Sequence, residues 1–451
     1  MNVKIEKLVY GGEGLGHTEG QTVFVPFVLP GETVAVRPVE RKKKFVRGQL
    51  QHIIMPAAER AVAPCPHFVA CGGCNYQHIP YEAQLEYKKQ ILRETLWRIG
   101  RVKWNGDIHV HPSPPFGYRN RAQWKIRPFD PMPSGQSAAQ GKQAIGYYRA
   151  NSAALLPIEQ CPILSPRLES SLQALRALLA DSRLPVTLRE IEIFADDRDD
   201  KLLLNASCTE FEGSPDALAA TLRDALPGAE SILLHESSRD RFELFGPGFI
   251  TYRAAGADFR VGHLSFFQVN RHLIDEMVQV VTAGRQGRSA PMHRGSALDL
   301  FAGVGLFSVP LARHFQRVTA VESNEAAARD LQVNLAALGD RTQVACADVV
   351  QFLDRADAPY DLVMLDPPRA GVPSSALHRI AQLAPPHISY LSCDPATLAR
   401  DLALLTAPGN AATASPGGGR APSPYSITDV HLFDLFPQSF HIESFVRLAL
   451  T

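Results

Sequence analysis

The sequence predicts an α/β protein in three parts: an OB-like β-barrel, a central mixed α/β region and a C-terminal Rossmann-like parallel sheet. Short strand-like runs separated by glycine and proline fill residues 1–58, which is typical of a small barrel. A central domain is expected at 59–255, where strands and short helices mix over about 105–255. A third domain is expected at 256–451, where strand and helix alternate at short intervals from residue 296 onward. A chain of 451 residues is also too long for a single core.

The composition indicates a folded protein whose charge is unevenly divided. Hydrophobic residues make up 45% and charged residues 20%, which excludes global disorder. The net charge is zero, but residues 1–130 hold 19 basic and 11 acidic side chains, and the rest hold 27 and 35. The basic N-terminal part is therefore a candidate for contact with nucleic acid.

The sequence gives no sign of a membrane segment or a secretory signal. No run approaches the roughly 18 consecutive apolar residues of a membrane span, and Lys4, Glu6 and Lys7 interrupt the N-terminus. We therefore expect a cytoplasmic protein, in which structural disulfides are disfavoured. The seven cysteines then need another explanation.

The first part is expected to hold four strands, at residues 4–9, 22–28, 32–38 and 46–54. The glycine-rich segment 11–16 is expected to be a turn, since no βαβ unit surrounds it that would make it a dinucleotide-binding loop. The basic run at 41–44 is expected in a loop, either as a solvated charge cluster or as a contact for RNA phosphates.

A cysteine cluster opens the central region. Cys65, Cys71 and Cys74 have the spacing C-x5-C-x2-C, and Cys161 follows far downstream. Four thiolates converging in this way suit either a tetrahedral zinc ion or a cubane iron–sulfur cluster, and the spacing does not decide between them. A helix is expected at 81–99, and the segment 81–100 is a candidate to pack on the third part.

The third part begins with a candidate nucleotide-binding loop. A buried strand at 296–300 runs into Phe301 and Gly303, just before a helix, and glycines at such a turn let a ligand approach the helix N-terminus. The next strand ends in Glu322, 19 residues beyond Gly303, where a carboxylate commonly binds ribose hydroxyls. NAD and S-adenosylmethionine both fit these features.

The next strand ends favour the methyl donor. A third strand ends near Asp348, and a fourth, at 361–365, ends in Asp366, which opens the tetrapeptide Asp-Pro-Pro-Arg. Its prolines cannot extend the sheet, so they hold a rigid loop at the strand ends. Residues 407–424, rich in glycine, proline, alanine and serine, are expected to be a disordered insertion.

Two further residues are candidates for catalysis. A fifth strand, at 388–391, delivers Cys393 to the same edge, where a nucleophile would be placed. Cys208 and Cys346 are instead interpreted as small buried hydrophobic residues. Glu443 precedes the last strand, and an apolar setting would raise its pKa as a general base requires.

Together these motifs resemble a known family. The segment Phe-Phe-Gln-Val-Asn at 266–270, the loop at 299–305, Asp-Pro-Pro-Arg at 366–369, Ser-Cys-Asp-Pro at 392–395 and the block at 436–443 occur in that order. They resemble the RNA uracil-5-methyltransferases over residues 260–450. The barrel resembles the TRAM domain of the ribosomal-RNA branch, and the four cysteines resemble its [4Fe-4S] site. The implied fold is a class I methyltransferase domain behind a TRAM barrel.

The resemblance also implies roles for single residues. Cys393 is similar to the family's nucleophile and Glu443 to its proton acceptor. The residues similar to S-adenosylmethionine contacts are Gln268, Phe301, Gly303, Glu322, Asp348 and Asp366. The chain departs from the family pattern at Ala302, Leu306 and Asp394, where Cys, a small polar residue and Asn are more usual. A carboxylate at 394 would disfavour the Cys393 thiolate, so we expect it to point away or to be paired.

The resemblance therefore predicts a monomer that moves a methyl group from S-adenosylmethionine to carbon 5 of a uridine in RNA, through a covalent Cys–uracil intermediate. Large-subunit ribosomal RNA is the favoured substrate and transfer RNA the alternative.

The competing hypotheses are an iron–sulfur redox enzyme, an inactive RNA chaperone of the same fold and an RNA cytosine-5-methyltransferase, which typically needs a second cysteine near the Asp-Pro-Pro loop. The candidate RNA contacts are Tyr118, Arg119, Arg121 and Trp124, although Trp124 suits a core position equally well.

Overall fold

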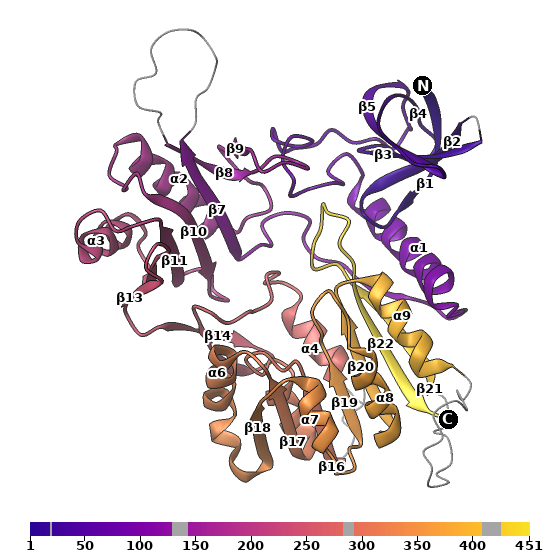
Figure 1. Ribbon diagram of the computed structural model, residues 1–451, viewed down its shortest axis with the longest axis vertical. Coiled ribbons are helices and arrows are strands. Elements are labelled where there is room, and N and C mark those ends of the chain that lie inside the picture. The colour runs from indigo at the N-terminus through magenta and orange to yellow at the C-terminus, as the bar shows by residue number, and fades with distance from the viewer. Residues whose placement is uncertain (19, 129–142, 283–292, 408–424) are drawn as a thin grey trace.

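The computed structural model describes residues 1–18, 20–128, 143–282, 293–407 and 425–451. Three parts are visible in Figure 1: a barrel at the N-terminus, a central sheet with two helices, and a large C-terminal sheet covered by helices on both faces. The expected insertion at 407–424 lies almost wholly outside the described residues. None of the helices in the described ranges is long and apolar enough to cross a membrane.

The N-terminal barrel is closed, with the strand order β1-β2-β3-β5-β4 among the described residues. Its strands are β1 (Asn2–Val9), β2 (Glu13–Thr18), β3 (Gln21–Pro26), β4 (Thr33–Arg41) and β5 (Phe45–Met55). Alternating valine and isoleucine side chains fill its interior. The basic run 41–44 is exposed and lies where β4 turns into β5, as predicted.

The observed barrel contains one strand, β2, that is not among the four predicted strands. The glycine-rich segment, expected to be a turn, supplies most of β2. A Cβ atom on Gly16 would lie 2.2 Å from the carbonyl oxygen of Lys4, and one on Gly14 would lie 2.4 Å from Val28 Cγ2. These glycines therefore let β2 lie close to its neighbours in a narrow barrel, rather than breaking the chain into a loop.

The central sheet has the order β13-β12-β11-β10-β7-β8-β9 in the part of the chain that the structure describes. Its strands are β7 (Arg121–Pro128), β8 (Gln143–Tyr148), β9 (Leu155–Pro157), β10 (Leu188–Ala195), β11 (Leu202–Cys208), β12 (Ala229–Glu236) and β13 (Arg241–Phe245). Helices α2 (Pro166–Ala180) and α3 (Pro215–Ala225) contribute leucines to the same core. Trp124 is fully buried in that core.

The C-terminal sheet has the order β18-β17-β16-β19-β20-β22-β21-β6 in the described ranges. Its parallel strands are β16 (His293–Leu300), β17 (Phe315–Glu322), β18 (Thr342–Cys346), β19 (Leu362–Leu365) and β20 (His387–Ser392). Strand β22 (Glu443–Leu450) runs antiparallel to β20, and β21 (Tyr425–Phe433) runs antiparallel to β22. The edge strand β6 (His109–His111) comes from the central part of the sequence.

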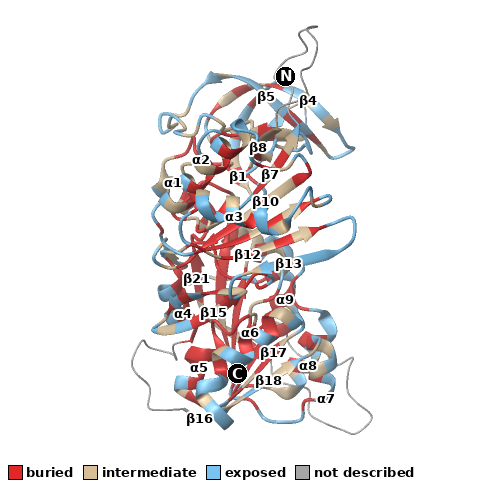
Figure 2. Ribbon diagram, turned by 90° about the vertical axis from the view of Figure 1, so that its left-hand side faces the viewer, coloured by how far each residue is buried: buried red, intermediate tan, exposed pale blue. Residues whose placement is uncertain are grey.

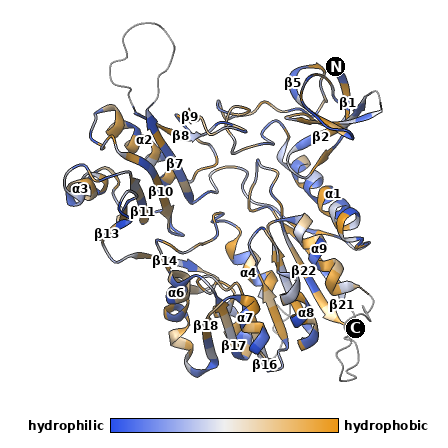
Figure 3. Ribbon diagram, viewed as in Figure 1, coloured by the Kyte–Doolittle hydropathy of each residue, from blue (hydrophilic) through white to orange (hydrophobic). Residues whose placement is uncertain are grey.

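Helices cover both faces of this sheet. One face packs on α7 (Val349–Arg355), α8 (Ser374–Leu383) and α9 (Pro395–Thr406), and the other on α4 (Ile274–Thr282), α5 (Ser308–His314) and α6 (Glu325–Leu335). A 3₁₀-helix (Ala336–Arg341) follows α6, and a hairpin of β14 (Phe249–Ala254) and β15 (Ala257–Gly262) precedes α4. The strands are largely buried (Figure 2) and mostly apolar (Figure 3), as strands covered on both faces must be.

Helix α1 (Tyr81–Gly100) lies between the barrel and the C-terminal sheet. It extends one residue beyond the predicted helix and ends where Arg101 adopts a left-handed conformation with φ of 56°. Its apolar face packs against α9, and a Cβ on Gly100 would lie 2.2 Å from the carbonyl oxygen of Ala399. Glycine therefore allows the two helices to approach closely.

Candidate active site

The predicted strand-end residues lie at one edge of the C-terminal sheet. Parallel strands place their carboxyl ends at the same edge, and the strands β16, β17, β18, β19 and β20 end at or just before Phe301, Glu322, Asp348, Asp366 and Cys393. Because β22 is antiparallel, its first residue, Glu443, also lies at this edge. Ser392 pairs with Ser444, so Cys393 and Glu443 belong to the ends of adjacent strands.

The loop after β16 leaves room for a ligand. Phe301 and Gly303 both have left-handed backbone conformations, with φ of 63° and 56°. Apart from Gly303 and its two chain neighbours, no heavy atom of the described residues lies within 4 Å of the position that a Cβ on Gly303 would occupy. The Gly303 N–H donates to Glu322 Oε2 at 2.8 Å, and the Asn324 N–H donates to Glu322 Oε1 at 2.7 Å. The carboxylate is thereby fixed beside the open face of the glycine loop.

Two aspartates beneath this loop are desolvated. Burial raises the pKa of Asp299 to about 7, and its Oδ2 accepts a hydrogen bond from the Ser308 hydroxyl at 2.5 Å. Burial also raises the pKa of Asp366 to about 7, with a further contribution from the negative charge of Asp299. A cation placed at this edge would favour the ionised form of both carboxyl groups.

Asp348 is held by hydrogen bonds at a helix end, and Gln268 is buried. Asp348 caps α7, because its Oδ1 accepts the N–H groups of Val350 at 2.9 Å and Gln351 at 3.3 Å. Gln268 is buried in the segment between β15 and α4. Two residues later, Asn270 Nδ2 donates to the carbonyl oxygen of Leu435 at 3.1 Å, which ties this segment to the sheet edge.

The environment of Cys393 favours the neutral thiol. Burial, followed by the negative charges of Glu443 and Asp366, raises the pKa of the half-buried Cys393 to about 12, and Arg369 opposes the shift. Burial and then the charge of Asp366 hold the pKa of Glu443 well above its usual range, again opposed by Arg369. Glu443 is therefore buried, as a raised pKa requires, but two charged side chains, Asp366 and Arg369, also influence it.

Asp394, which follows the candidate nucleophile, is paired as expected. Its Oδ1 accepts the N–H groups of Ala396 and Thr397, both at 2.9 Å, and thereby caps α9. Its Oδ2 accepts a hydrogen bond from the hydroxyl of Tyr10 at 3.0 Å. Tyr10 belongs to the barrel and was not predicted from the sequence, because nothing in the sequence indicates a contact across so many residues.

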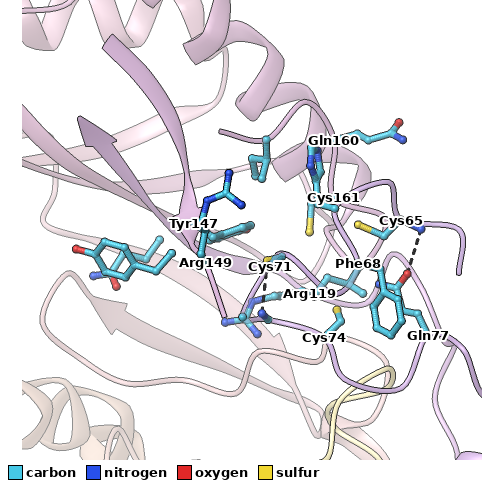
Figure 4. A pocket seen from close by; sticks show the side chains of 17 residues that line it. Cys65, Phe68, Cys71, Cys74, Gln77, Arg119, Tyr147, Arg149, Gln160 and Cys161 are labelled. Atoms are coloured by element: carbon cyan, nitrogen blue, oxygen red, sulfur yellow. Dashed lines mark hydrogen bonds between the residues drawn. The ribbon is translucent and has the colours of Figure 1, made fainter. Parts of the chain in front are cut away.

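The four clustered cysteines line a separate pocket with a volume of about 380 Å³. Figure 4 shows Cys65, Cys71, Cys74 and Cys161 around a common space. The Gly73 N–H donates to Cys71 Sγ at 3.4 Å, and Gln77 accepts the Cys65 N–H at 3.1 Å. Among the described residues, no three His, Cys, Asp or Glu side chains are gathered closely enough to hold a metal ion.

The charges of these thiols are coupled. Burial raises the pKa of Cys74 to about 11 and that of Cys161 to about 12. For both, the other cysteines of the set raise the pKa further. The pocket therefore favours neutral thiols unless a positively charged group is present to stabilise thiolates.

Several other sequence predictions are resolved by burial. Trp124 and Tyr118 are buried in the core, so neither can stack on an RNA base. Arg119 and Arg121 line a shallow surface pocket, where Arg121 pairs with Glu192 at 2.7 Å. The interpretation of Cys346 as buried is wrong: it is exposed, because β18 is an edge strand, whereas Cys208 is buried as predicted.

The sequence matches two family models. The model described as tRNA (Uracil-5-)-methyltransferase matches residues 250–450, and the TRAM domain model matches residues 1–50. The first match covers every strand-end residue described above, and the second covers most of the barrel.

Full-length relatives are also similar to this chain. A 23S rRNA (uracil(1939)-C(5))-methyltransferase from Azoarcus sp. is 31% identical, with 98% of this chain and 97% of the relative covered. A protein of the same name from Dechloromonas aromatica is 30% identical, with 99% of each covered. The crystal structure of Pyrococcus abyssi tRNA (uracil-54, C5)-methyltransferase in complex with S-adenosyl-L-homocysteine has a TM-score of 0.73, 25% identity and full coverage of both chains.

Proposed function

This chain belongs to the S-adenosylmethionine-dependent RNA uracil-5-methyltransferases, and from this premise we propose that it methylates carbon 5 of a uridine in 23S ribosomal RNA through a covalent bond to Cys393. The observation that carries the proposal is the placement of Cys393 and Glu443 on the adjacent ends of β20 and β22. Both residues lie at the sheet edge that also carries the glycine loop and Glu322.

The proposed reaction uses the two side chains in turn. The thiolate of Cys393 adds to carbon 6 of the uracil, and the resulting enolate attacks the methyl group of S-adenosylmethionine from carbon 5. The sulfonium leaves as S-adenosylhomocysteine. Glu443 then removes the proton on carbon 5, the electron pair forms the 5,6 double bond, and the bond from carbon 6 to sulfur breaks to regenerate the thiolate.

The electrostatics of the resting site suit this order of steps. The thiol is the stable form before the substrates bind, which protects it from reaction with other electrophiles. The positive charge of the sulfonium would favour the ionised forms of Cys393, Asp366 and Glu443 together. Arg369 contributes in the same direction, because it lowers the pKa of both Cys393 and Glu443.

The proposed contacts of the methyl donor lie around the glycine loop. They are Gln268, Phe301, Gly303, Glu322, Asp348 and Asp366. The open space beside Gly303 and the fixed carboxylate of Glu322 support binding of the nucleoside there. The uridine must leave its stack to reach this edge, as in other base-modifying enzymes.

Ribosomal RNA is the proposed substrate because relatives named for 23S rRNA are 30% and 31% identical to this chain over nearly all of both sequences. The structure named for transfer RNA is 25% identical. A monomer acting in the cytoplasm is the accompanying expectation.

We also propose that the cysteine pocket holds a [4Fe-4S] cluster bound by Cys65, Cys71, Cys74 and Cys161. The residues fit such a group, because four thiols surround a pocket of about 380 Å³ and cysteine thiolates are the usual ligands of such clusters. A cluster would cross-link the loop 65–74 to residue 161, and methyl transfer would need no electrons from it.

Labelled S-adenosylmethionine tests the substrate directly. The protein is incubated with transcripts of 23S rRNA domains and with transfer RNA, and the position of any 5-methyluridine is mapped. We expect label in one uridine of the ribosomal transcript, at or equivalent to the position 1939 for which the relatives are named. Label in transfer RNA alone would contradict the proposed substrate, and label in neither would contradict the proposed activity.

A further inference from the structure

The segment 434–442, here called the base loop, joins β21 to Glu443 at the start of β22. In Figure 1 it is the yellow loop that rises from the sheet towards the barrel and the segment 65–79, here called the cysteine segment. Phe440 in this loop meets the barrel, because a Cβ on Gly12 would lie 3.2 Å from Phe440 Cδ1. All three parts of the molecule therefore meet at the loop that carries the chain into Glu443.

Gln438 holds the base loop in a strained shape. It has a left-handed backbone, with φ of 68°, which is uncommon for any residue other than glycine. Gln84 of α1 compensates this strain with two reciprocal bonds. Gln84 Nε2 donates to Gln438 Oε1 at 3.0 Å, and the Gln438 N–H donates to Gln84 Oε1 at 3.0 Å. Both side chains are buried.

The backbone of Gln438 is also held by the cysteine segment. Its carbonyl oxygen accepts the N–H groups of Asn75 at 2.9 Å and Tyr76 at 3.0 Å, the two residues that follow Cys74. Gln84 Nε2 donates a second bond, to the carbonyl oxygen of Ile79 at 2.8 Å. The side chain of Gln84 therefore links the base loop to the cysteine segment.

Buried polar groups fix the rest of the loop. Lys88 Nζ donates to Asp434 Oδ1 at 2.6 Å and to the carbonyl oxygen of Phe436 at 3.1 Å. The Tyr118 hydroxyl donates to the carbonyl oxygen of Pro437 at 3.0 Å. Buried polar groups keep such bonds, because losing one partner leaves the other desolvated and unsatisfied.

We propose that Gln84 is a positioning residue for the proton-removal step, and that it acts by holding Gln438 in the conformation that sets where Glu443 enters β22. This inference rests on the proposed function, in which Glu443 removes the proton from carbon 5. Within the described ranges, the side-chain hydrogen bonds of Gln84 go to Tyr76, Ile79 and Gln438, and none goes to Cys393 or to the glycine loop after β16. Replacing Gln84 should therefore slow the elimination of Cys393 from the methylated base. It should leave the addition of Cys393 to the base and the methyl transfer unchanged.

The full-length protein can separate these steps. Wild type, Glu443→Gln and Gln84→Leu are mixed with labelled S-adenosylmethionine and an unmodified 23S rRNA transcript. Free 5-methyluridine and denaturation-resistant, methylated RNA–protein adduct are both measured. We expect Gln84→Leu to release product about tenfold more slowly or worse, the scale of a misplaced general base, and to accumulate the adduct as Glu443→Gln does. Its adduct with 5-fluorouridine RNA, which needs no proton removal, should form within about twofold of the wild-type rate.

A second variant tests the route through Gln438. Glycine adopts a positive φ without strain, so Gln438→Gly introduced into the Gln84→Leu protein should restore part of the product release. Tyr252→Phe is the matched control, because it removes a buried hydrogen bond from Asn120, at 3.1 Å, in which no residue of the base loop takes part. It should release product without accumulating adduct.

Product release at the wild-type rate by Gln84→Leu would overturn the proposal. Loss of both the methylated adduct and the 5-fluorouridine adduct in Gln84→Leu would also overturn it, because that result indicates general misfolding. The proposal would likewise be overturned if Gln438→Gly restored no product release to the Gln84→Leu protein. If wild type forms no 5-methyluridine and Glu443→Gln traps no adduct, the proposed function fails and this proposal fails with it.

Discussion

Two carboxyl groups and one guanidinium influence the pKa of the Cys393 thiol, after burial. The charges of Glu443 and Asp366 raise its pKa after burial has done so, and Arg369 lowers it. The sequence indicated Cys393 as a candidate nucleophile by its position after a strand, and Asp394 by its contrast with the asparagine that is more usual in the family. It did not indicate how Asp394 is paired, because Tyr10 is distant in the sequence and comes from another part of the fold.

The pH dependence of Cys393 follows from this environment. In the free protein, only the thiolate reacts with iodoacetamide. Since the pKa of the thiol is raised to about 12, the rate of Cys393 alkylation should increase about tenfold per pH unit below that pH. Arg369→Gln should raise the pKa further and slow the reaction at every pH. Peptide mass spectrometry measures the rates, with the exposed Cys346 as an internal reference.

A rate that is constant from pH 7 upward would show that the thiol is already ionised at neutral pH. An unchanged rate in Arg369→Gln would show that this guanidinium does not stabilise the thiolate.

Strand β2 of the barrel shows that glycine can favour a turn in one setting and allow close packing of strands in another. In the free chain glycine favours turns, but Gly16 leaves space that any side chain would fill. We expect Gly16→Ala to destabilise the protein by about 1–3 kcal/mol, since its Cβ would overlap the carbonyl oxygen of Lys4. Urea unfolding measures this, and His17→Ala, at an exposed position in the same strand, is the control.

Equal stabilities for Gly16→Ala and His17→Ala would contradict the close packing of β2 on β1. A loss in Gly16→Ala alone would confirm it.

Strands and helices could be predicted from the sequence where the order of apolar and polar residues reflects burial alone. The central parallel strands β19 and β20 are apolar runs that are almost wholly buried, and both were expected within one residue of their observed bounds. The helix α1 was predicted to within one residue. The position of Cys346 was not predictable, because a short strand looks the same in sequence whether it lies at the centre of a sheet or at its edge.

The three parts of the molecule meet at the sheet edge that carries Cys393 and Glu443. Tyr10 reaches Asp394 from the barrel, and the cysteine segment and α1 bind Gln438. The basic N-terminal part noted in the composition carries an exposed loop at 41–44, available to RNA phosphates. Contacts of this kind depend on the folded arrangement of all three parts, so motifs read one at a time could not reveal them.

The cluster proposed for the cysteine pocket can be tested by measuring the iron content of the protein. Anaerobic incubation with iron and sulfide should load about four iron atoms per chain and produce visible charge-transfer absorption. Cys65→Ser should lose most of the iron, because one of four ligands is removed. Cys208→Ser is the control, since Cys208 is buried in the central core and does not line the pocket. Equal iron contents in the two variants, or uptake of zinc alone, would contradict the proposed cluster.

The central claim is that Cys393 forms a covalent bond to the target uracil, and adduct mapping tests it most directly. The protein is incubated with S-adenosylmethionine and 23S rRNA transcript containing 5-fluorouridine, digested, and examined by mass spectrometry. We expect a nucleotide attached to Cys393 in the wild type, no adduct in Cys393→Ala, and a normal adduct in Cys346→Ala, which removes an exposed cysteine from the end of β18. An adduct that persists in Cys393→Ala, or one that maps to another residue, would contradict the claim.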